Sequence, residues 1–516
     1  MLPAAPTRNI RLLKCEDATP YRLCSIANGY GEPYGRGLLF GYDQGVIANV
    51  LVMKDFRQRL SMSDWQEGLM TAMLELGALV GALLAGMFAD RHSRKRSILT
   101  ACVIFCVGST LQCTAQHLRD LIAGRAIGGI GIGSLSMLSP LYMAEISPPE
   151  VRGSLMTLEQ FAIVLGVVFG FWTGFFTRDF PGSISWRLPL AIQILPAVIM
   201  ALGSFVLPPS PRLLIFQGKN DEALRALSRL RLRLPEDEQT DPLLRIEFLE
   251  MKVEAELISR SASASANKNV FAAELHSWQR LFSQWSGINA LVYYGPLLMQ
   301  RIGLEGDTPE LLGSGGVGIV QFIAVVPAII YIDRLGRKPL LQWGGIVMGL
   351  AHMSIALLVY HYQGSWSAHH FAAWTAVGCV YLFTAAYGLS YGPIAWILPS
   401  EVLPLSIRSK GSAVATSSVW INNCLVTPAC LSASAVGTFT IFSLACFGAS
   451  LWSRICVPET AGVSLEEIDA LFSSDAGRED AELRREIMRE VGLEALIEEL
   501  SLTDGSRGLE STILFP

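Results

Sequence analysis

One aspartate lies where a charged side chain is costly. Asp43 stands in the stretch "LLFGYDQGVIANVLVM", between Gly41 and Gly45. An ionised carboxylate inside hydrocarbon costs about 2.5–3.5 kcal/mol on insertion scales. Asp43 is therefore either a structural charge held by a neighbouring arginine or a site that takes up and releases a proton. Burial disfavours the charged form and a nearby cation favours it, so alternating contact with an arginine would switch the proton affinity.

The composition favours a membrane protein. The chain has 516 residues, of which 51% are hydrophobic and 16% are charged, whereas soluble domains average about 25% charged residues. The net charge of −5 argues against a nucleic-acid partner. The ten cysteines form no CxxC pair and most lie in apolar runs, so neither a disulfide framework nor a metal site is expected. The polar N-terminus does not have the pattern of a cleavable signal peptide.

Twelve apolar segments predict twelve membrane-spanning helices. A helix needs roughly 20 apolar residues to cross a bilayer. Two segments, 38–53 and 284–299, are shorter than this. The polar segment 208–283 divides the twelve six and six, and the acidic tail reads as an exposed amphipathic helix. The other ten segments are 69–89, 97–115, 121–143, 155–176, 188–207, 313–332, 341–360, 371–398, 411–431 and 435–457.

The two halves repeat each other. The strings "DRHSRK" and "DRLGRK" each follow the second span of their half. Glu145 and Arg152 in "EISPPEVRG" have the spacing of Glu401 and Arg408 in "EVLPLSIRSKG". A duplicated six-helix unit predicts an all-α membrane protein with two pseudo-symmetric halves around a central cavity, which is typical of transporters.

The basic residues predict the orientation. Short clusters of arginine and lysine follow the second, eighth and tenth segments, and the central loop is rich in arginine, so these loops and both termini are expected in the cytoplasm. The connection "KDFRQR" is a modest exception. The expected divisions are an N-terminal segment 1–33, a first half 34–207, a cytoplasmic linker 208–283, a second half 284–457 and a C-terminal tail 458–516.

Nine motifs in order resemble the sugar-porter branch of the major facilitator superfamily, especially its fungal monosaccharide transporters. The resemblance covers about 34 to 472. The motifs are "GLLFGYDQGVI", "DRHSRK", "GRAIGGIGIG", "PLYMAEISPPEVRG", "PPSPR", "QWSGINALVYYGP", "DRLGRK", "YGPIAWILPSEVLP" and "PETAGVSLEEIDALF". The resemblance implies a twelve-helix bundle in the plasma membrane that moves a neutral sugar with protons by alternating access. It implies no cofactor, no enzymatic activity and a monomeric transport unit.

The resemblance also implies roles for Asp43 and for a glycine-rich segment. The proton-coupled members have an aspartate in "FGYD", with an arginine partner in the fourth helix that Arg125 matches here. Asp43 is thus expected to accept the proton and Arg125 to modulate it. The glycines of "GRAIGGIGIGS" follow no strand, so we expect them to allow close helix packing rather than to bind a dinucleotide.

The expected substrate site is built from amide and aromatic side chains. A sugar offers many hydroxyls and no charge, so it needs groups that both donate and accept hydrogen bonds, and flat apolar surfaces for its ring. For any single amide, a hydrogen bond between helices is the alternative interpretation. Matched by motif, the site residues are Gln160, Gln284, Asn289, Gln321, Trp396 and Asn423, with Tyr387 and Tyr391 nearby.

A second set of residues is expected to gate the transporter. Carboxylate–guanidinium pairs at the cytoplasmic ends would close the inside, and glycine and proline would bend the seventh and tenth helices at Gly295–Pro296 and Gly392–Pro393. Ser93 replaces a glycine of the first motif and Pro209 replaces a glutamate, which would leave Arg212 short of a partner. The set comprises Asp90, Arg91, Arg94, Glu145, Arg152, Arg212, Tyr293, Tyr294, Asp333, Arg334, Arg337, Glu401 and Arg408.

Helices 1 and 7 are expected to be truncated. About 16 residues span about 24 Å, short of the roughly 30 Å hydrocarbon core. Extending these helices upstream would put Glu32, Arg36 or Arg280 at lipid depth.

Several alternatives to proton-coupled sugar uptake stay open. They are an inactive product of a truncated gene model, a facilitative sugar carrier, a quinate or polyol carrier, and a sugar sensor. An anion such as quinate would need a cation in the cavity, and Arg125 is already assigned to Asp43.

Overall fold

The computed structural model describes helices, with no strand among the residues described. The chain divides into two units. The larger comprises Pro33–Val206 and Arg260–Glu479, and the smaller comprises Met1–Glu32, Leu207–Ser259 and Asp480–Pro516. The described residues are 20–89, 93–146, 152–205, 208–231, 241–261, 284–301, 307–362, 365–402, 408–432, 434–457, 459 and 476–500.

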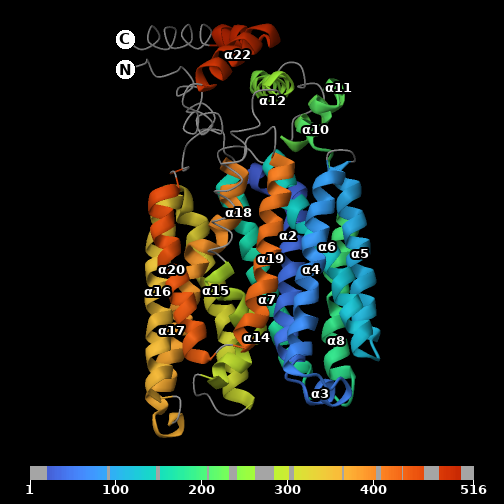
Figure 1. Ribbon diagram of the computed structural model, residues 1–516. Coiled ribbons are helices and arrows are strands. Elements are labelled where there is room, and N and C mark those ends of the chain that lie inside the picture. Colours follow the sequence, from blue (N-terminus) through green and yellow to red (C-terminus); the bar gives the residue numbers. More distant parts are fainter. Residues whose placement is uncertain are drawn as a thin grey trace. The chain divides into compact units, whose positions relative to one another are not determined.

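The larger unit is a bundle of long helices (Figure 1). Its first half contains α2 (Pro20–Val50) from Pro33 onward, α3 (Lys54–Arg59), α4 (Asp64–Ala89), α5 (Arg94–Thr114), α6 (Leu118–Ile146), α7 (Arg152–Thr177), α8 (Ile184–Ile192) and α9 (Ile194–Gly203). Its second half contains α14 (Ile288–Arg301), α15 (Asp307–Leu335), α16 (Arg337–Tyr362), the short helix η3 (Trp366–Ala368), α17 (His370–Leu389), α18 (Tyr391–Val402), α19 (Arg408–Ser432) and α20 (Ala435–Cys456). The halves meet where α4 packs on α19 and where α7 packs on α15 and α18.

Nine stretches of the described residues are long and apolar enough to cross a membrane. They are formed by α4, α5, α6, α7, the pair α8–α9, α15, α16, the pair α17–α18, and α20. The other three helices that complete the bundle are α2, α14 and α19. Each of these carries buried polar side chains, such as Asp43, Asn289 and Asn423. With them the bundle has the twelve-helix arrangement that the sequence predicts.

The apolar part of the first helix is short, as predicted, but the helix itself is not truncated. α2 is 31 residues long and begins at Pro20, well upstream of the apolar run. The helix continues through Arg36 because that side chain is only 1% exposed and has a partner inside the protein. The side chain of Glu32 and all of Arg280 lie outside the described residues.

The predicted truncation of the seventh helix falls on positions just before 284, which lie outside the described residues. α14 has 14 residues. It follows Gly287, whose φ of 93° is a left-handed conformation that glycine adopts without a steric penalty. The carbonyl oxygen of Ser286 accepts a hydrogen bond from Nε2 of the buried His352 at 2.9 Å. This bond from α16 fixes the turn that starts α14.

Glycines bring pairs of helices into backbone contact. A Cβ atom on Gly129 or Gly133 of α6 would overlap the carbonyl oxygens of Leu74 and Ala78 in α4. Gly41 of α2 would overlap the carbonyl oxygen of Ile163 in α7 in the same way. Small residues are what permit such close approach in membrane bundles. The prediction that the glycine-rich segment serves helix packing is confirmed.

We expect Gly133→Ala to destabilise the bundle, because its new methyl group meets backbone that cannot rotate away. Overpacking of this kind costs about 1–3 kcal/mol. The control is Gly378→Ala in α17, where a Cβ would have nothing within 4 Å and where alanine is better than glycine in a helix by up to about 1 kcal/mol. The melting temperature of the purified protein in detergent should fall for Gly133→Ala only; equal values for the two variants would contradict this packing.

Among its described residues, the smaller unit contains α10 (Pro211–Phe216), α11 (Asn220–Leu230), α12 (Pro242–Ser261) and α22 (Ala476–Val491), and residues 493–500 are also helical. Leu214, Leu227 and Met251 are buried in one apolar cluster of this unit. The predicted amphipathic helix of the tail packs apolar residues such as Ile487 against Ile246 of α12.

Candidate functional site

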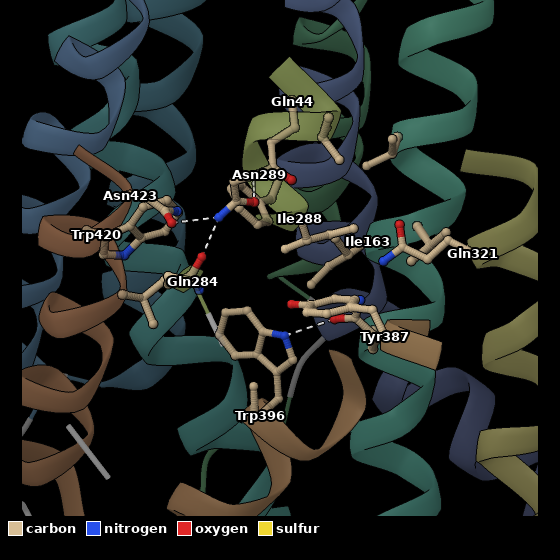
Figure 2. A pocket seen from close by; sticks show the side chains of 17 residues that line it. Gln44, Ile163, Gln284, Ile288, Asn289, Gln321, Tyr387, Trp396, Trp420 and Asn423 are labelled. Atoms are coloured by element: carbon tan, nitrogen blue, oxygen red, sulfur yellow. Dashed lines mark hydrogen bonds between the residues drawn. The ribbon is translucent and has the colours of Figure 1, made fainter. Parts of the chain in front are cut away.

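A pocket inside the bundle collects the six predicted binding residues. Helices of both halves line it: α2, α7, α14, α15, α17, α18 and α19, with Gln284 coming from the segment before α14 (Figure 2). Apolar side chains such as Phe40, Ile163 and Trp420 form the rest of its wall. The predicted residues among the lining are Gln160, Gln284, Asn289, Gln321, Trp396 and Asn423.

The amides on one side of the pocket form a hydrogen-bonded cluster (Figure 2). Asn289 Nδ2 donates to Oε1 of Gln284 and, at 2.6 Å, to Oδ1 of Asn423. Oδ1 of Asn289 accepts a 3.5 Å hydrogen bond from Gln44 Nε2. An amide group both donates and accepts, so this cluster can exchange its internal bonds for bonds to a polyhydroxyl ligand.

Trp396 provides the flat apolar surface on another side of the pocket. Its indole Nε1 donates to Oε1 of Gln160 at 3.0 Å, which holds the ring in place. Tyr387 also lines the pocket, whereas Tyr391 is buried and is not part of the lining. The Arg36 guanidinium lies 4.6 Å from the Trp396 ring centroid, within cation–π range.

Arg36, which an upstream extension of the first helix was expected to put at lipid depth, is buried inside the protein. Its side chain forms an ion pair with Glu159 of α7, and both side chains are at most 1% exposed. Arg36 is also a second buried cation near the pocket, besides Arg125. It is not part of the pocket lining, and Glu159 already neutralises its charge.

Asp43 and Arg125 are brought together, as predicted. Both are completely buried, and Nη2 of Arg125 lies 3.8 Å from Oδ2 of Asp43. Neither carboxylate oxygen of Asp43 accepts a hydrogen bond from the described residues. The pair is not part of the pocket lining, but Gln44, the next residue of α2, is. The ion pair and the pocket are therefore adjacent on one helix.

The sequence interpretation missed two residues of this region, Gln44 and Glu75. Glu75 of α4 is 0% exposed and accepts a 2.5 Å hydrogen bond from the hydroxyl of Tyr293. Its only signal in the sequence is a single acid in the apolar string "AMLELGALVGALLAG". Gln44 directly follows Asp43, and its signal was its place in the same motif.

Part of the predicted charge network is described. Arg94 and Glu145 form a buried ion pair, with Nη2 and Oε1 2.7 Å apart. Arg337 is buried at the start of α16 and Arg334 is exposed. Asp90 and Arg91 lie outside the described residues, as do the side chains of Arg152, Asp333, Glu401 and Arg408.

Three details of the network differ from expectation or add to it. Ser93 begins α5 in an extended conformation with φ of −61°, so no glycine is needed there. Arg212 has a partner after all, because its Nη1 lies 2.9 Å from Oε2 of Glu254 in the smaller unit. Glu459 accepts hydrogen bonds from the backbone N–H groups of Arg337 and Lys338 at 2.9 and 3.0 Å. That contact caps α16 just after the left-handed Gly336.

The seventh and tenth helices break near the predicted hinges. Tyr294 has non-helical φ and ψ of −115° and 23° inside α14, immediately before Gly295 and Pro296. α17 ends at Leu389, and Ser390, with φ of −126° and ψ of −85°, separates it from α18. Tyr293 and Tyr294 are both buried.

Comparison with known proteins shows the family of this chain. Residues 34–472 match the family model described as sugar (and other) transporter. The chain is 32% identical over 466 residues to the probable polyol transporter 6 of Arabidopsis thaliana, covering 86% of this chain and 93% of the relative. It is 31% identical over 469 residues to the probable glucose transporter rco-3 of Neurospora crassa, covering 84% and 77%.

A solved structure has the same fold. The proton:xylose symporter XylE bound to 6-bromo-6-deoxy-D-glucose superposes with a TM-score of 0.77 at 26% identity. The match covers 88% of this chain and all of that one. Together with the paired halves, the buried Asp43–Arg125 pair and the amide-lined pocket, these matches make the chain a sugar transporter of the sugar-porter family in the major facilitator superfamily.

Proposed function

We propose that this transporter takes up a neutral monosaccharide, a hexose or a related sugar, by proton symport across the plasma membrane. The observation that carries the proposal is the completely buried pair of Asp43 and Arg125 beside a pocket without a charged lining residue. A buried carboxylate with one cation and no hydrogen bond is poised to exchange a proton when its contact with that cation changes. Protonation of Asp43 would loosen the pair and allow the halves to move with sugar bound.

The composition of the pocket supports a neutral substrate. Its polar lining consists of amides and a tyrosine, and its aromatic wall is formed by Trp396, Trp420 and Phe40. Such a surface binds hydroxyls and the C–H face of a sugar ring. Arg36, the other cation nearby, is paired with Glu159, which disfavours an anion such as quinate.

Gate and orientation are part of the same proposal. Tyr293 and Tyr294, at the break in α14, would close the outer side, and Arg94, Glu145 and the related charges of the second half would close the inner side. The loops rich in arginine and lysine are expected on the cytoplasmic side, and both termini are expected on the same side as these loops. Six helices on each side of the linker then form the moving halves of a monomeric unit.

A polyol carrier is the second candidate. A relative with 32% identity is named as a probable polyol transporter, and polyols offer the same hydroxyls without a ring. Trp396 would contribute less to binding an open-chain polyol than to binding a ring, so Trp396→Ala should weaken transport of a sugar more than that of a polyol.

Asp43→Asn is expected to abolish concentrative uptake of the sugar while still allowing the sugar to equilibrate across the membrane. The test measures uptake of radiolabelled D-glucose, D-xylose, a polyol and quinate in cells that lack their own carriers, at pH 5 and pH 8, with and without a protonophore. The native chain should accumulate a sugar above its external concentration at pH 5 and lose this with the protonophore. Asp43→Asn, which removes the proton site, should only equilibrate the sugar.

The outcomes separate the alternatives. Equilibration by the native chain, unaffected by protonophore or by Asp43→Asn, would make it a facilitator with a structural Asp43. Sugar binding without uptake would favour a sensor. A version with longer apolar first and seventh helices tests the remaining alternative, since transport by that version alone would mean that the native chain is inactive.

A further inference from the structure

A second carboxylate lies inside the bundle, and proton symport through Asp43 leaves it unused. Glu75 stands in the middle of α4 and is 0% exposed. Acidic side chains inside membrane helices are rare and mark functional positions by default. The neighbours of Glu75 indicate what its function is.

Both oxygens of Glu75 accept hydrogen bonds from the second half of the bundle. Oε1 accepts from the hydroxyl of Tyr293 at 2.5 Å, and Oε2 accepts from Nδ2 of Asn423 at 3.4 Å. Tyr293 directly precedes the break in α14, and Asn423 is on α19. Glu75 therefore ties α4 of the first half to two helices of the second, at a point where one of them bends.

The same partners connect Glu75 to the pocket. Asn423 lines the pocket itself, and its Oδ1 accepts a hydrogen bond from Asn289 at 2.6 Å. The hydroxyl of Tyr293 accepts one from Gln44 at 3.2 Å. Asn289 and Gln44 also line the pocket. A change of hydrogen bonding at Glu75 thus reaches the ligand-binding amides directly or through one side chain.

Glu75 also lies in the electrostatic field of the Asp43–Arg125 pair. Among the described residues, the charged and titratable groups that interact electrostatically with it are Asp43 on α2, Arg125 on α6, Tyr293 on α14 and Cys424 on α19. Arg125 attracts its charge and Asp43 repels it. Two buried carboxylates that interact with one guanidinium leave an excess negative charge in the protein interior when both are ionised, and one shared proton removes it.

We propose that Glu75 is a positioning residue of the proton step. Glu75 and Asp43 share one proton, and the charge of Glu75 sets the orientation of Asn423. This rests on the proposed symport. An ionised carboxylate only accepts hydrogen bonds, so it turns the NH2 group of Asn423 toward itself. A protonated carboxyl donates one, and Asn423 can then turn its oxygen to Glu75 and its NH2 group to the pocket. The proton thereby changes which groups a sugar hydroxyl meets.

The first test reads the protonation of Glu75 without transport. Infrared difference spectra of the purified full chain are recorded through a pH titration, and the carbonyl band of protonated carboxyl groups is followed. Glu75→Gln should remove part of this band and shift the titration of what remains, because Asp43 loses its competitor for the proton. The control is Glu67→Gln, on the same helix but half-buried, which should change neither. A band that Glu75→Gln leaves unchanged overturns the proposal.

The second test uses D-glucose as the probe and tryptophan fluorescence as the signal, since Trp396 and Trp420 line the pocket. Gain or loss of one linked proton changes affinity by about tenfold per pH unit over the range in which it titrates. The native chain should therefore bind D-glucose with affinities that differ by about tenfold or more between pH 5 and pH 8. Glu75→Gln should reduce this difference to about twofold or less. A pH profile identical to that of the native chain overturns the proposal.

A conservative variant keeps the test decisive. Glu75→Asp retains a carboxyl, so it should restore the band and part of the pH dependence. If Glu75→Gln yields no folded protein, Glu75→Asp is the only variant tested. We then expect both the carbonyl band and the midpoint of the pH dependence of glucose affinity to shift. If neither shifts, the proposal is contradicted. If the native chain concentrates sugar but Glu75→Gln leaves the carbonyl band unchanged, only the role of Glu75 is refuted. If the carbonyl band changes but neither the native chain nor any variant concentrates sugar, the proposed symport is refuted.

Discussion

Arg125→Gln should end concentrative sugar uptake. Arg125 is completely buried, lies 3.8 Å from Asp43 and also attracts Glu75. Removing one partner of a buried ion pair leaves an uncompensated buried charge, which costs about 3–5 kcal/mol of stability. A carboxylate left without its cation avoids this cost by keeping a proton, and it can then no longer release that proton inside. We expect the initial rate of proton-driven uptake to fall about a hundredfold or more.

The double variant Asp43→Asn/Arg125→Gln separates coupling from folding. It removes both charges of the pair, so it should fold better than either single variant and equilibrate sugar without concentrating it. The matched control is Arg187→Gln, a half-buried arginine whose Nη2 donates to the carbonyl oxygen of Ala115 at 2.8 Å, and it should retain accumulation. Uptake by Arg125→Gln that remains concentrative and sensitive to protonophore would contradict the role of the pair.

Arg36→Met should strongly destabilise the bundle, and Glu159→Gln should rescue it. The single change leaves Glu159 buried without its ion-pair partner and removes the guanidinium over Trp396. Breaking such a pair costs about 3–5 kcal/mol, whereas replacing both members by uncharged side chains of similar volume is often neutral. The melting temperature in detergent should drop for Arg36→Met and recover in Arg36→Met/Glu159→Gln.

An exposed ion pair of the same bundle is the control for this prediction. Arg59 and Asp55 are 2.9 Å apart in α3, and the Arg59 side chain is 54% exposed. Pairs of this kind contribute about 0–1 kcal/mol, so Arg59→Met should hardly change the melting temperature. Equal shifts for Arg36→Met and Arg59→Met would mean that the buried pair does not stabilise the fold.

Much of the architecture could be predicted because its signals are local. Apolar runs of spanning length mark the helices, since backbone inside lipid must satisfy its own hydrogen bonds. Repeated motifs mark the duplication. The six predicted pocket residues, including Gln160, Asn289 and Trp396, do meet in one pocket, at positions that the family resemblance implies. Asp43 could be singled out because a charge in an apolar run is visible without knowing its neighbours.

Other parts of the site could not be predicted, because their partners are distant in the chain. Arg36 and Glu159 are 123 positions apart, Glu75 and Tyr293 are 218 apart, and Glu75 and Asn423 are 348 apart. Nothing in the residues around Glu75 tells which helices α4 will face. For the same reason, the sequence could not show that Arg36 has a buried partner in Glu159.

By itself the sequence determined a membrane bundle of duplicated halves, an acid in the first helix and a set of amides at motif positions. Those features depend on length, periodicity and residue type along one helix. Only the tertiary structure decided that two further acids, Glu75 and Glu159, are buried with partners from other helices. The cost of a buried charge depends on the groups within a few ångströms of it, and helix packing, not chain order, places those groups there.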